Sequence, residues 1–149
     1  MTLAILLLPI VEAFSDPGFD AAAAEAMLGN AVHKSATRWQ IAPRSPDVAQ
    51  IELDFEDLPA GPHLLTTIRV VLRKPADASL DSLRSQFGAT GRWLPATGPE
   101  RPQLLAFDYA KGSLPVTVML NAEYPRDDAK LVIGSALMRR FYPDRPRSR

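Results

Sequence analysis

The run AQIELDFEDL at residues 49–58 constrains the fold more than any other stretch, because apolar and acidic side chains alternate through it. Ile51, Leu53 and Phe55 fall on one face of an extended segment, and carboxylates occupy the other. This period of two is typical of an antiparallel strand with one buried and one solvated face. The pattern therefore predicts a sheet that is covered on one side and open on the other.

Other segments with β-branched content or alternation are also predicted as strands, and turn residues separate them. They are residues 36–42, 64–74, 91–96, 102–110 and 115–124. The last apolar segment, 129–142, is ambiguous between two structures. We favour a strand over 131–136, with a C-terminal helix as the alternative.

Two helices are predicted between these strands. The first covers about 17–29, with Asp16 as its N-cap, a run of four alanines, and Gly29 or the residue after it at the end. The second begins after Ser79 and stops at Gly88. Its apolar stripe consists of Leu80, Leu83 and Phe87.

The order of elements, with the strand favoured at 131–136, indicates an internal repeat. The pair Arg38-Trp39 has a counterpart in Arg92-Trp93, and Asp54 has one in Asp108 at the same spacing. The apolar face of 49–58 maps onto Leu105, Phe107 and Tyr109. We therefore predict an α+β fold with two α-βββ repeats, at about 17–75 and 76–142. They would form a curved antiparallel sheet with helices on one face, in a single globular domain over 14–142.

The second unit, SLDSLRSQFGATGRWLP followed by QLLAFDYA, resembles the fold shared by the outer-membrane assembly lipoprotein BamE and the β-lactamase inhibitor protein. The resemblance implies tandem α-βββ units. The chain departs from that pattern by having PADAS where a Gly-Met-Thr step is common, and it lacks the cysteine of a lipid anchor. If 130–141 were helical, the order α-βββ-α-ββ-α would instead resemble type III secretion chaperones.

The N-terminus predicts export. Residues 3–11 are nine apolar residues without a charge, too few for a bilayer span of about 20 residues but suited to a signal peptide. VEA at 11–13 offers small residues for cleavage after Ala13. We therefore predict a signal peptide over 1–13 and a periplasmic or secreted protein. The alternative is a buried N-terminal helix or strand of a cytoplasmic protein.

Charge and composition exclude several classes of protein. The net charge is formally zero, so no global field favours nucleic acid. Without cysteine there is no disulfide, cysteine metal site or cysteine nucleophile. The basic tail, 143–149, is expected to be solvated, with contact to an anionic partner as the alternative. High Ala, Arg and Pro usage is typical of a GC-rich bacterium.

The sequence contains few candidate catalytic residues. His33 and His63 are far apart, and no phosphate-binding glycine loop or dinucleotide fingerprint is present. We expect no catalytic residue, metal or cofactor. The carboxylates Glu52, Asp54 and Glu56 are expected to form a solvated strand face, with a carboxylate-site enzyme as the minor alternative.

Binding of a partner through a surface is the function that these exclusions favour. We predict a non-catalytic exported bacterial protein, envelope-associated or protein-binding, that uses an exposed sheet face. The alternative is a cytosolic partner-binding protein of secretion-chaperone or immunity type. Candidate contacts are side chains of types enriched at interfaces, although core packing is the favoured explanation for them. They are Arg38, Trp39, Arg92, Trp93, Phe107 and Tyr109.

Overall fold

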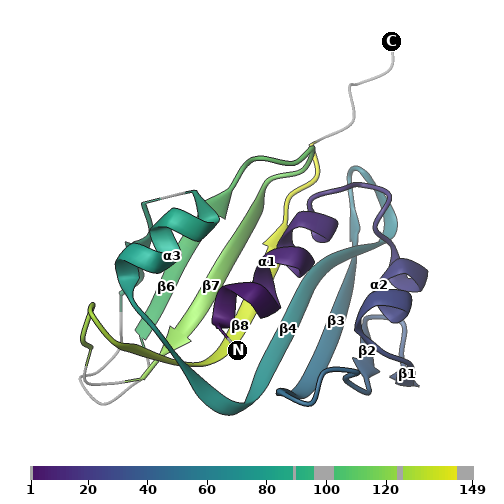
Figure 1. Ribbon diagram of the computed structural model, residues 1–149. Helices are drawn as coiled ribbons and strands as arrows, with labels where there is room; N and C mark the ends of the chain where they lie inside the picture. The colour runs from purple at the N-terminus through teal and green to yellow at the C-terminus, as the bar shows by residue number, and fades with distance from the viewer. Residues whose placement is uncertain (1, 89, 96–102, 124–125, 144–149) are drawn as a thin grey trace.

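The computed structural model of the chain describes residues 2–88, 90–95, 103–123 and 126–143. These residues form three helices and eight strands (Figure 1). The helices are α1 (Leu3–Phe14), α2 (Ala21–Leu28) and α3 (Leu80–Phe87). The strands are β1 (Ala31–Lys34), β2 (Arg38–Ile41), β3 (Val48–Leu58), β4 (Gly61–Ala78), β5 (Arg92–Trp93), β6 (Gln103–Tyr109), β7 (Val116–Ala122) and β8 (Leu131–Arg140).

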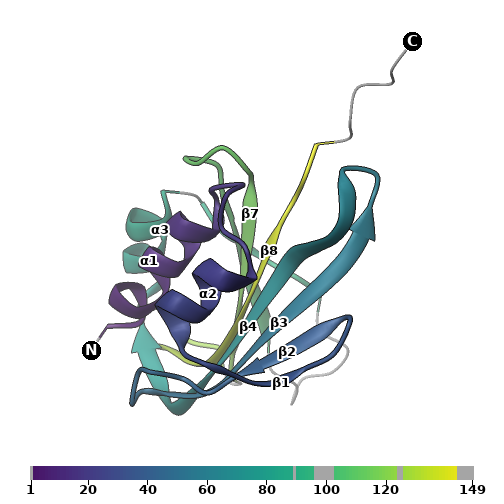
Figure 2. The same cartoon turned by 90° about the vertical axis from the view of Figure 1, so that its right-hand side faces the viewer.

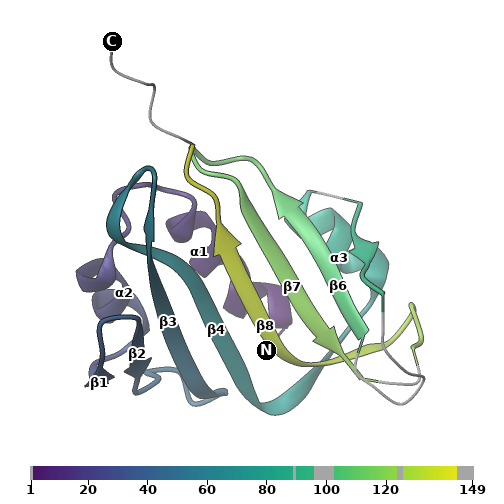
Figure 3. The same cartoon turned by 180° about the vertical axis from the view of Figure 1, so that it is seen from behind.

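All eight strands belong to one antiparallel sheet, in the order β1-β2-β3-β4-β8-β7-β6-β5. The predicted α+β class and antiparallel sheet are confirmed, and the sheet is open rather than a closed barrel. The last strand, β8, lies in the middle between β4 and β7, where it joins the first four strands to the others. Figure 3 shows the face of the sheet that the helices do not cover, with the helices behind it.

The strand predicted at 49–58 is β3, and its apolar face is buried as expected. Ile51, Leu53 and Phe55 are at most 4% exposed. The ambiguous segment 129–142 contains β8, a strand that is longer than predicted. The helix alternative is therefore wrong, and with it the order of elements that resembles secretion chaperones. Residues 144–149 of the basic tail lie outside the described residues, as do the ends of the strands expected at 91–96, 102–110 and 115–124.

The first predicted helix, α2, begins later than expected. Asp20 rather than Asp16 is its N-cap, because the Asp20 carboxylate accepts the N–H of Ala23 at 2.9 Å. Asp16 instead accepts the N–H of Gly18 and closes a turn. The helix ends at Gly29, whose φ of +138° favours glycine and where a Cβ would lie 1.9 Å from the carbonyl oxygen of Ala42, the residue after β2.

The second predicted helix, α3, has the predicted ends. The Ser79 hydroxyl accepts the N–H of Ser82 at 3.1 Å, and Gly88 ends the helix in the left-handed conformation. Leu80, Leu83 and Phe87 are buried beneath it. Local capping chemistry therefore sets both ends of α3.

The N-terminal apolar run forms α1, which contacts β4, β7 and α3. Figure 2 shows α1 among the helices on one side of the sheet. Leu7, Val11 and Phe14 are 0% exposed, and Leu3 and Ile10 are at most 4% exposed. α1 is therefore a layer of the main hydrophobic core in this structure.

A buried arginine connects α1 to the sheet. The Arg140 side chain is 3% exposed at the end of β8, and its guanidinium donates to the carbonyls of Phe14, Asp16 and Phe19 at 2.6 to 3.1 Å. Its Nε also donates to the Leu65 carbonyl of β4 at 2.9 Å. Burial lowers the pKa of the Arg140 guanidinium, but an arginine remains charged in proteins. One side chain thus satisfies backbone acceptors from three parts of the chain.

Arg140→Met should destabilise the protein by about 3 kcal/mol or more, because it leaves buried carbonyls without donors. Arg139→Met is the matched control, since Arg139 lies on the opposite sheet face and is partly exposed. It should cost no more than about 1 kcal/mol. Urea unfolding measures both variants. Equal losses would show that the buried contacts of Arg140 add nothing beyond those of a surface arginine.

Candidate binding surface

The open face of the sheet is the one opposite the buried side chains of the strands. Strand register places six of its residues in one row across the sheet, since each lies beside its neighbour on the adjacent strand. The row is Arg38, Asp54, Thr67, Arg139, Thr117 and Asp108. Residues that are distant in sequence therefore form one continuous polar surface.

Ion pairs neutralise the acidic face of β3. Asp54 accepts from Arg38 at 2.7 Å and from Arg69 at 3.3 Å. Glu52 lies 3.4 Å from Arg38. Glu56 accepts from the Thr66 hydroxyl and from Arg139, the latter at 2.8 Å.

The hydrogen bond from Thr66, followed by that from Arg139, lowers the pKa of Glu56 below its ordinary value of 4.5. A carboxyl with a lowered pKa is a poor proton donor near neutral pH. The partners of Glu56 thus hold it as an anion.

A similar arrangement lies toward the other edge of the sheet. Arg92 of β5 donates to Asp108 of β6, which also accepts from Thr117 of β7 at 2.9 Å. The bond from Arg92 is the main cause of the lowered pKa of Asp108. These contacts place Arg92 on the same face as Arg38, and each arginine is paired with an aspartate of the neighbouring strand.

An apolar strip lies next to the polar row on the open face. Leu137, Met119 and Ala106 are neighbours on β8, β7 and β6; the first two are partly exposed, whereas Ala106 is 1% exposed. Val71 and Leu104, each 37% exposed, lie at the two ends of the next row of the face, with Ser135 and Asn121 between them. These five residues are called the apolar strip below. Its charged neighbours are paired with one another, so the strip has an apolar centre and a polar border.

The four aromatic candidate residues have their side chains on the opposite, helix-covered side. Phe107 is 0% and Tyr109 is 6% exposed, and the Phe107 ring lies 5.2 Å from that of Phe87. Trp39 and Trp93 are partly buried and pack against the core. Lys34 lies 4.3 Å from the Trp39 ring, and Arg126 lies 4.5 Å from the Trp93 ring. The structure thus separates the two arginines from the four aromatic residues.

The histidines and carboxylates do not gather into a metal site within the described residues. His63 stacks on Phe55 with ring centroids 4.6 Å apart, and His33 is exposed on β1. Among the same residues, no helix is long and apolar enough to cross a membrane.

Sequence reasoning missed the arginines and apolar residues that β4, β7 and β8 contribute to the open face. The alternation within 115–124 separates Met119 from the core positions, but no local pattern places it beside Leu137. A search of protein-family models, curated proteins and solved structures finds no match to this chain. The resemblance to BamE and the β-lactamase inhibitor protein therefore stays a prediction.

The Glu56 contacts predict a pH dependence of stability. Because the folded-state pKa is lowered, the contribution of Glu56 is present above 4.5 and is lost as the pH falls through the folded-state value. Glu56→Gln should destabilise the protein by up to about 1 kcal/mol near neutral pH, since the side chain is partly exposed. The loss should vanish well below the folded-state pKa. Urea unfolding across pH measures this, with Glu123→Gln as an exposed control; a constant loss at all pH values would contradict it.

Proposed function

We propose that the protein is a non-catalytic module that binds another protein through the open face of its sheet. The apolar strip is the observation that carries this proposal. Stable interfaces combine an apolar centre with a polar rim, and the strip with its ion-paired border has that layout. The residues of the border are held in place by contacts across β2, β3, β4 and β8, so little ordering is needed when a partner binds.

The carboxylate-site enzyme is the weaker candidate function. Its three residues, Glu52, Asp54 and Glu56, are each engaged by arginines. A general acid requires a raised pKa, whereas that of Glu56 is lowered. These contacts favour a structural role for the acidic face.

Two substitutions at opposite ends of the strip test the surface. Val71→Lys and Leu104→Lys place a charge at positions that are already partly exposed, so the fold should survive. Each should weaken partner binding about tenfold or more, because a charge would have to be desolvated in the interface. Ile5→Lys is the matched control, because Ile5 lies on α1 and is 67% exposed, and this variant should bind normally.

The measurement is cross-linking and affinity capture from the native cell, followed by titration of the captured protein against each variant. Circular dichroism verifies the fold of each variant. Unchanged affinity in both strip variants, or loss in Ile5→Lys alone, would contradict a site on the open face.

The protein has two candidate cellular locations, each with its own form of the chain. In the exported form, residues 1–13 are removed and the protein acts in the bacterial envelope. In the cytoplasmic form, α1 stays and the protein binds a cytosolic partner. The packing of α1 favours the second form, because cleavage after Ala13 would expose the core that Leu7 and Val11 now cover. Loss of a single buried leucine side chain typically costs about 2–5 kcal/mol, and cleavage removes several.

Intact mass of the protein from its native cell separates the two forms. We expect residues 2–13 to be present in the mature protein, with their amides folded into α1. A mature chain that begins at Phe14 would contradict the cytoplasmic form and support export.

A further inference from the structure

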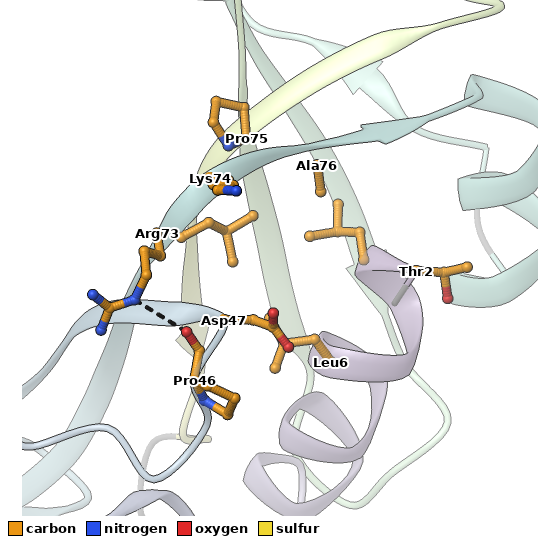
Figure 4. A pocket seen from close by; sticks show the side chains of 10 residues that line it. Thr2, Leu6, Pro46, Asp47, Arg73, Lys74, Pro75 and Ala76 are labelled. Carbon is orange, nitrogen blue, oxygen red and sulfur yellow. Dashed lines mark hydrogen bonds between the residues drawn. The ribbon is translucent and has the colours of Figure 1, made fainter.

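A cavity of about 340 Å³ lies between the start of α1, the turn before β3 and residues 72–76 of β4. It is on a different part of the molecule from the apolar strip and is unrelated to the proposed function. Figure 4 shows Leu6 of α1, Asp47 before β3 and Lys74 of β4 beside this hollow. Its volume is near the lower end of the range for small-molecule sites, about 300–1,000 Å³, so it suits a compact ligand.

A large bulge in β4 forms one wall of the cavity. Val71 pairs with Ser135 of β8, but the next pair is Ala76 with Ile133, so residues 72–75 leave the ladder with β8, while Leu72 still pairs with Val48 of β3. The displaced segment includes Pro75, which has no N–H to donate to β8. Such bulges frequently lie beside functional sites.

The bulge is held in a defined position. The Arg73 guanidinium donates to the Pro46 carbonyl at 3.1 Å, as Figure 4 shows, and the Arg73 N–H donates to the Asp47 carbonyl at 2.9 Å. These bonds join the bulge to the turn before β3. The wall of the cavity is therefore preorganised, which lowers the cost of binding a ligand.

Asp47 and Lys74, which are both exposed, carry opposite charges at the border of the cavity. In the part of the chain that the structure describes, neither the Asp47 carboxylate nor the Lys74 ammonium has a hydrogen bond or an ion pair to another side chain. The guanidinium of Arg73, by contrast, is engaged by Pro46. Asp47 and Lys74 are thus an acceptor and a donor that remain available at the same hollow.

The lining also includes aliphatic side chains beside its polar groups. Leu3, Leu6, Leu72 and Ala76 contribute aliphatic side chains. Thr2 and Leu3 bring the N-terminal end of α1 to the rim, where the helix dipole favours a negative group. Within one small cavity, Lys74 can therefore bind an anionic group, Asp47 can bind a cationic group, and the aliphatic side chains can contact an apolar group.

We propose that this cavity binds a small zwitterion with an apolar side chain, namely a free apolar amino acid such as leucine or phenylalanine. The ammonium of the ligand bonds to Asp47, and its carboxylate bonds to Lys74 near the start of α1. The side chain rests on the leucines of the floor. The ligand class follows from the two charges and the volume, and α1 must be present to complete the site.

Isothermal titration calorimetry of the full chain with L-phenylalanine and L-leucine tests the proposal. Saturable binding is expected for both. For phenylalanine, 3-phenylpropanoate lacks the ammonium and 2-phenylethylamine lacks the carboxylate, so each should bind about tenfold more weakly. Binding of all three with equal affinity would show an apolar cavity without zwitterion recognition and would overturn the proposal.

Variants identify the residues. Asp47→Asn and Lys74→Met should each weaken phenylalanine binding about tenfold, and Asp47→Asn should no longer distinguish phenylalanine from 3-phenylpropanoate. Asp81→Asn and Lys111→Met are exposed controls away from the cavity and should bind normally. Absence of saturable binding to either amino acid, or full binding by both cavity variants, overturns the proposal. Leu104→Lys, on β6 and away from the cavity, should retain amino-acid binding, which separates this outcome from that of the proposed function.

Discussion

The contacts of the Arg140 guanidinium join the helical layer to the sheet. Arg140 lies at the end of the central strand β8, and its donors reach the end of α1, the segment leading to α2, and β4. A buried charge requires full hydrogen bonding to be tolerated, so this site permits little rearrangement. The position of α1 over the sheet, and therefore the cavity at its N-terminus, depends on this arrangement.

The two faces of the sheet use charge differently. On the covered side, the buried guanidinium of Arg140 is surrounded by backbone carbonyls and aromatic rings. On the open side, arginines and carboxylates pair with one another across strands, and the apolar strip lies beside them on the same face. Because the charges on the open side are matched locally, shape and apolar area rather than net charge would select a partner.

Features set by neighbouring residues could be predicted from the sequence. Ser79 and Gly88 set the ends of α3, and the alternation in β3 assigned its buried face. Asp20 replaced Asp16 as a cap because both residues suit that role and only the path of the preceding turn distinguishes them. The apolar run of α1 suits a signal peptide and a core helix equally, since both need the same residue types. The pairing of β8 between β4 and β7 depends on contacts over long sequence separations, which no local pattern records.

Native-state amide hydrogen exchange over residues 6–14 tests the central claim most directly. If α1 is part of the core and Arg140 holds its C-terminal end, these amides should exchange only through global unfolding, with the same opening free energy as the amides of β4 and β8. Exchange of residues 6–14 at rates near those of an unstructured peptide, while β4 and β8 stay protected, would contradict the account.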